Sequence, residues 1–106
     1  MGSLSLEFKK KVADIYQEKI TKMEKLDPTT MENFAIEIIE KIDKEKKNSN
    51  AIHDLEILEY NMKLLKKYSG ALKQYTPDTD EFDFTQNDCK NLVDSTKKWL
   101  KLEGLI

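Results

Sequence analysis

The most informative absence in this chain of 106 residues is arginine, because all 18 of its basic residues are lysine. Arginine is the usual bidentate reader of phosphate and guanine and a common interface anchor, so its absence argues against specific recognition of nucleic acid. The net charge of −2 gives no overall field that would attract the protein to nucleic acid or to an acidic membrane. With 3 glycines and 2 prolines, the chain also lacks the turn residues of a β-rich protein.

Cysteine and long apolar runs are equally scarce. The single cysteine, Cys89, excludes an internal disulfide framework, and we expect it to be a small buried hydrophobe. A lone cysteine fits a reducing, intracellular setting, either cytoplasmic or, in a eukaryote, nuclear. No apolar run approaches the roughly 20 residues that a membrane-spanning helix needs. We therefore expect a soluble protein without membrane insertion, formed by a single helical domain over residues 1–106.

Apolar residues recur at helical spacing in four stretches of the chain. They predict helices at about 5–26, 28–46, 51–75 and 86–102, joined by short connections. Asp27-Pro28 separates the first two helices, because a proline disfavours helical conformation in the residue before it. The fold class is therefore all-α, and the short connections favour a single up-down-up-down four-helix bundle.

The stretch 51–75 carries the strongest helical signal. Its first apolar stripe, at alternating steps of four and three residues, is Ala51, Leu55, Leu58, Met62, Leu65, Ser69 and Leu72. The stripe beside it is Ile57, Leu64, Tyr68, Ala71 and Tyr75. Two adjacent stripes make a face wide enough to contact at least two other helices. Gly70 costs about 1 kcal/mol relative to alanine inside a helix, so we expect a kink near Ser69-Gly70 or a break that adds a fifth segment.

Residues 77–85 are predicted to form a loop in which carboxylates alternate with aromatic rings. The helix that follows should begin at Thr85, where the run from Thr85 to Asp88 resembles a capping box. The predicted third helix is longer than the second, so its last turns should overhang the bundle and need a cover. The loop could fold back and close the core there. Alternatively, this end could be an acid-rimmed aromatic groove that receives an amphipathic or Lys/Arg-bearing segment of another protein.

The second alternative defines a set of candidate partner-binding residues, which combine the aromatic rings expected at this end with the acidic rim. They are Tyr68, Tyr75, Asp78, Asp80, Glu81, Phe82, Phe84 and Trp99.

No catalytic residue, metal site or cofactor is predicted. The acidic run that starts with Asp78 and Asp80 invites comparison with a calcium-binding EF-hand loop. Such a loop needs an oxygen ligand, a glycine and a glutamate at three later positions, and here these are Phe82, Asp83 and Cys89. The interpretation that remains is an acidic loop in solvent.

Two pairs of glutamates have the spacing that helical metal enzymes use, Glu37 with Glu40 and Glu56 with Glu59. Both pairs are expected to face away from the apolar stripes, toward solvent. A di-iron bundle would also need two Glu-x-x-His motifs, and the only histidine, His53, has no glutamate three residues before it. These pairs therefore favour a charge-paired outer face over a catalytic centre.

The stretch 64–102 resembles the helical N-terminal domain of transcription elongation factor IIS and its relatives. The matching elements are Leu65, Gly70 and Leu72, then Leu92-Val93 and Trp99-Leu100-Lys101. In that family the Leu-Val pair lies closer to the tryptophan and follows a basic stretch, which Gln74 and Tyr75 replace here. The resemblance covers less than half of the chain, and it implies docking of short disordered peptides.

These observations favour a non-enzymatic protein–protein interaction module, such as an adaptor or an assembly subunit, with a protein or peptide as its partner. One alternative is a small inhibitor or immunity-type protein that blocks a basic toxin or enzyme. A second is a helical enzyme that uses the four glutamates. A third is self-association through the wide apolar face of residues 51–75.

Overall fold

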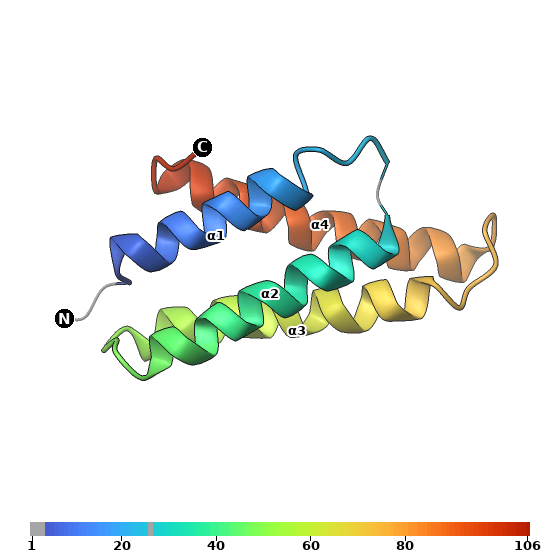
Figure 1. The fold of residues 1–106 in the computed structure, drawn as a ribbon. Helices are drawn as coiled ribbons and strands as arrows, with labels where there is room; N and C mark the ends of the chain where they lie inside the picture. Colours follow the sequence, from blue (N-terminus) through green and yellow to red (C-terminus); the bar gives the residue numbers. More distant parts are fainter. Residues whose placement is uncertain (1–3, 26) are drawn as a thin grey trace.

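The computed structural model describes residues 4–25 and 27–106, and it forms four helices (Figure 1). They are α1 (Leu6–Lys19), α2 (Pro28–Lys46), α3 (Ile52–Leu72) and α4 (Asp80–Leu102). The predictions of an all-helical chain and of four helices are therefore confirmed. No helix within the described residues is long and apolar enough to cross a membrane.

Side-chain caps fix where three of the helices begin. The Ser5 hydroxyl accepts a hydrogen bond from the backbone N–H of Phe8 at 3.1 Å, in the first turn of α1. At α2, the Asp27 carboxylate accepts from the backbone N–H of Thr30 at 3.0 Å and from its hydroxyl at 2.6 Å. These two bonds favour the charged carboxylate and hold the pKa of Asp27 below its usual value. The predicted role of Asp27 as a cap before Pro28 is confirmed.

The first predicted helix is too long. α1 ends at Lys19, where the backbone N–H groups of Ile20 and Thr21 both bond to the carbonyl of Tyr16 and the chain turns. The predicted end of this helix, Leu26, lies outside the described residues. Ile20 stays buried although it follows the helix, so apolar spacing alone overestimated the helix length.

The break predicted near Ser69-Gly70 is wrong, because α3 continues through both residues to Leu72. A Cβ atom placed on Gly70 would lie 2.9 Å from a carboxylate oxygen of Glu32 on α2. The glycine therefore marks a close approach of a neighbouring side chain, and the helix accommodates it. Tyr75 lies beyond the end of α3, in the turn that leads to α4.

The predicted start of the fourth helix is also wrong. α4 begins at Asp80, and its cap is Thr79, whose hydroxyl accepts from the backbone N–H of Phe82 at 3.3 Å. Asp80, Glu81 and Asp83 occupy the first turn, where negative charge interacts favourably with the N–H groups and dipole of a helix start. Residues 80–85, which make up most of the predicted acidic loop, therefore belong to the first two turns of a helix.

Short polar contacts join the end of one helix to the start of another. The backbone N–H and the hydroxyl of Ser5, before α1, both donate to Glu45 near the end of α2, at 3.1 and 2.7 Å. Lys73, just after α3, pairs with Glu32 near the start of α2 at 2.8 Å. Each of these helix pairs therefore runs in opposite directions, as Figure 1 shows.

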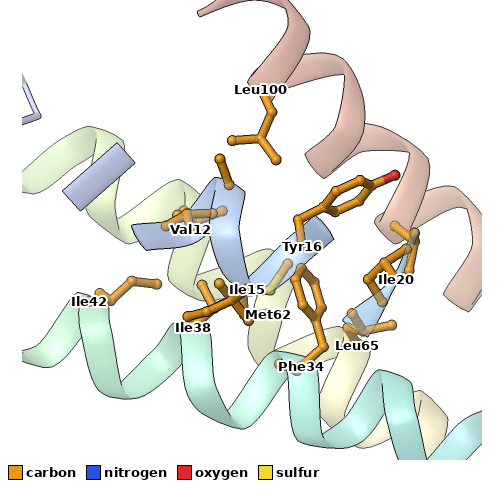
Figure 2. Close-up of a cluster of buried hydrophobic side chains, with 14 of the residues drawn as sticks. Val12, Ile15, Tyr16, Ile20, Phe34, Ile38, Ile42, Met62, Leu65 and Leu100 are labelled. Atoms are coloured by element: carbon orange, nitrogen blue, oxygen red, sulfur yellow. The ribbon is translucent and has the colours of Figure 1, made fainter. Parts of the chain in front are cut away.

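The core lies where the inner faces of all four helices meet (Figure 2). Tyr16 of α1 and Phe34 of α2 pack edge to face, with ring centroids 6.1 Å apart. Packing is most extensive between α2 and α3 and far sparser between α1 and α4. Side chains with no exposed surface include Val12, Met31, Phe34, Ile38, Ile42, Leu55, Met62, Leu65, Cys89 and Leu100.

Candidate functional site

Seven of the eight candidate partner-binding residues lie at one end of the bundle, where α3 turns into α4 (Figure 1). The eighth, Trp99, does not. It is 17 positions after Phe82 on the same helix, which places it roughly 25 Å away at 1.5 Å per residue. The expectation that Trp99 belongs to this aromatic end is therefore wrong. Even from the predicted helix start at Thr85, Trp99 would lie 14 positions along the helix, roughly 21 Å from this end.

The two phenylalanines of this end have different environments. Phe82 is half-buried and packs against the core, whereas the side chain of Phe84 is 72 % exposed. Residues two apart on a helix point about 200° from one another, so only one of the two rings can face inward. The first alternative expected a loop to fold back, with both Phe82 and Phe84 covering the core. Phe82 does pack against the core, but from the first turn of α4, and Phe84 is left on the surface.

The aromatic residues of α3 and of the turn after it are less open. Tyr68 is half-buried against the core, and Tyr75 is 39 % exposed. Asp78 in the same turn has φ of 70°, a left-handed conformation that aspartate tolerates better than most side chains. This turn brings Tyr75 and the start of α4 to the same end of the molecule.

Carboxylates surround Phe84 on the outer side of α4. Asp80 precedes it by four residues and Asp88 follows it by four, a spacing that places all three on one helix face, and Glu81 lies beside them. All four side chains are exposed, and none of the three carboxylates forms an ion pair within the described residues. We call Asp80, Glu81, Phe84 and Asp88 the Phe84 face. Asp88 was not among the candidates, because its relation to Phe84 follows only once the helix starts at Asp80.

Trp99 lines a separate pocket of about 380 Å³ between the start of α1, the first half of α3 and the last turns of α4. The indole is half-buried and packs against the core. An ion pair between Lys9 and Glu103, with 2.8 Å between nitrogen and oxygen, lies at this pocket. The other lining residues are Leu4, Asp54, Ile57, Leu58, Asn61, Ser95 and Thr96.

The two glutamate pairs do not converge. Glu59 pairs with Lys46 at 2.8 Å, and that hydrogen-bonded lysine lowers the pKa of the Glu59 carboxyl. Glu37 lies 3.7 Å from the Lys19 ammonium, whereas Glu40 and Glu56 are exposed. Among the residues that the structure describes, no group of three or more His, Cys, Asp and Glu side chains is arranged to hold a metal ion.

Cys89 is the most enclosed of the titratable side chains, with none of its surface exposed. Burial, and to a lesser extent the neighbouring Asp88 carboxylate, raise the pKa of the thiol to about 11. The group is therefore protonated near neutral pH, and a thiol is a much weaker nucleophile than a thiolate. His53, in the first turn of α3, is exposed.

Comparison of the chain with protein families, with curated proteins and with solved structures finds no match.

Proposed function

We propose that this chain is a non-enzymatic protein–protein interaction module, an adaptor or an assembly subunit, that binds a partner segment through the Phe84 face. The bundle that presents this face is taken to be up-down-up-down, which the contacts between helix ends support. The observation that carries the proposal is the exposed Phe84 ring, flanked four residues before and after by carboxylates that have no ion-pair partner among the residues that the structure describes.

An aromatic ring exposed on the surface is the type of side chain that anchors many interfaces, because it buries a large apolar area with little loss of conformational entropy. The carboxylates around it favour lysine or arginine in the partner and disfavour acidic segments. The segment that fits best is therefore amphipathic, with apolar residues for Phe84 and Tyr75 and basic residues for Asp80, Glu81 and Asp88. Asp78, Asp83 and the half-buried Tyr68 lie at the same end of the bundle.

The test compares capture of a partner from extracts of cells that express the protein, using two variants of exposed α4 residues. Phe84→Ala removes the proposed anchor, and Leu102→Ala, whose side chain is 79 % exposed at the other end of α4, is the matched control. We expect Phe84→Ala to lose the partner and Leu102→Ala to retain it, with the melting temperature of both close to that of the wild type. Equal capture by both variants would contradict the proposal.

The alternative, an inhibitor or immunity-type protein that blocks a basic toxin or enzyme, would use the same carboxylates. Titration of the captured partner separates the two functions, because a blocking protein binds tightly and with strong salt dependence, whereas an adaptor binds peptides weakly. Phe84 is a cleaner site for this test than Trp99, because replacing a tryptophan that packs against the core also changes stability.

A further inference from the structure

A hollow of about 650 Å³ lies between α1 and α4. The two helices are joined by the ion pair between Lys9, near the start of α1, and Glu103, just after α4, and they pack against each other only sparsely. Tyr16 and Ile20, both buried, form the apolar floor of the hollow together with the partly exposed Ile106. Figure 2 shows the Tyr16 hydroxyl directed toward α4. The bundle therefore leaves an apolar depression where α1 and α4 are sparsely packed.

The wall of this hollow on α4 carries positive charge. Lys97 and Lys101 are four residues apart, so they project from the same side of the helix. Both are exposed, and neither forms an ion pair within the described part of the chain. An occupant that fits this hollow has an apolar side chain with acidic groups one helical turn away.

The chain itself presents such a surface. On the Phe84 face, an exposed aromatic ring has a carboxylate one turn before it, on Asp80, and one turn after it, on Asp88. Phe84 and Lys97 are 13 residues apart on one rigid helix, about 20 Å, so a molecule cannot place its own ring in its own hollow. The two surfaces can meet only between two molecules.

We propose that the hollow between α1 and α4 binds the Phe84 face of a second copy of this chain. The ring would cover the floor formed by Tyr16 and Ile20, and the carboxylates beside it would pair with Lys97 and Lys101. Phe84 and Lys97 point about 220° apart around α4, so the two surfaces face different sides of the molecule and cannot pair reciprocally in one dimer. The contact is therefore head-to-tail, and each complex keeps one free Phe84 face and one free hollow. The assembly therefore grows with concentration and weakens with salt.

This contact needs no other protein, so it does not depend on the proposed partner. It uses the same Phe84 face, however, and binding of a partner segment there would release a neighbouring copy. Self-association and partner binding would then compete, with the monomer as the form that is ready to bind.

The test is sedimentation of the purified chain at increasing concentration, in roughly 50 mM and roughly 500 mM salt. Two variants each remove one surface: Phe84→Ala, and the pair Lys97→Glu with Lys101→Glu. The wild type should show a mass that rises with concentration at low salt, and each variant alone should lose at least about tenfold in association constant. The control is Lys66→Glu with Lys67→Glu, the same change of charge at exposed positions of α3, which should associate like the wild type.

Mixing the two variants gives the sharpest result. One supplies an intact hollow and the other an intact Phe84 face, so an equimolar mixture should form a dimer that does not grow further. A wild type that stays monomeric at the highest concentration would overturn the proposal, and so would variants that lose association alone and fail to restore it together. Partner capture by the Phe84 face is a separate measurement, so either result can fail without the other.

Discussion

The seam between α2 and α3 and the seam between α1 and α4 are built in different ways. The first is closed by side chains without exposed surface, such as Ile38 and Leu65, and has an ion pair toward each of its ends. The second has one ion pair at one end and a hollow over Tyr16 at the other. Stability and surface function are therefore expected on opposite sides of the bundle, since a tightly packed seam resists change and an open one leaves room for an occupant.

The largest expected effect on stability comes from replacing an isoleucine by alanine, once at the seam between α2 and α3 and once at the seam between α1 and α4. Ile38→Ala should lower the free energy of unfolding by about 3–4 kcal/mol, because Ile38 has no exposed surface and its neighbours cannot collapse fully into the cavity. Ile20→Ala should cost about 2 kcal/mol, since the residue borders a hollow that is already open. Urea denaturation followed by circular dichroism measures both, and equal losses would show that the two seams are packed alike.

A smaller effect is expected from the ion pair between Lys46 and Glu59, which joins the end of α2 to α3. The folded pKa of Glu59 lies below its usual value of 4.5, so its contribution is present above the unfolded pKa and is lost as the pH falls through the folded pKa. The difference in urea midpoint between wild type and Glu59→Gln should therefore be greatest near pH 7 and shrink below pH 4.5. The control is Glu56→Gln, an exposed neighbour on the same helix, and a difference that does not change with pH would contradict this account.

The smallest expected effect concerns Gly70, at the other end of the same seam. Gly70→Ala gains about 1 kcal/mol of helix propensity, but the new methyl group must displace the Glu32 carboxylate that pairs with Lys73. The net gain should therefore be less than about 1 kcal/mol, and it should increase when Glu32 is first replaced by alanine. A double-mutant cycle on thermal unfolding measures the difference, and the same gain in both backgrounds would exclude Glu32 as the reason for the glycine.

Much of the fold could be predicted from the sequence, because a buried helix face leaves a periodic pattern. The stripe from Leu55 to Leu72 is buried as predicted, and so are most of the apolar positions of α2. Periodicity does not report where a helix ends. Ile20 kept the spacing of α1 after the chain had turned, because the core can bury a side chain from a turn as well as from a helix.

The candidate site could be predicted only in part, for two physical reasons. Acidic residues are common in loops and at helix starts, so the run after Pro77 was assigned to a loop although Thr79 could have been identified as a cap. That error shortened α4 and hid the spacing of four residues that relates Phe84 to Asp80 and Asp88. The misplacement of Trp99 is separate, because its position late in the helix already put it far from this end. The hollow over Tyr16 could not have been predicted, because it depends on how closely α1 and α4 pack against each other, and no local pattern specifies that.

The single cysteine of the chain allows the opening of the seam between α1 and α4 to be followed over time. Cys89 lies on the inner side of α4, where it is fully buried and protonated at neutral pH. A thiol reagent in solution therefore cannot modify it while the bundle is closed. The rate at which a pulse of thiol reagent modifies Cys89 therefore measures the rate at which α4 detaches from the bundle, and no added label is needed. If α4 detaches before the rest of the bundle melts, modification will outpace global unfolding, and the ratio of the two rates will give the free energy that separates those events.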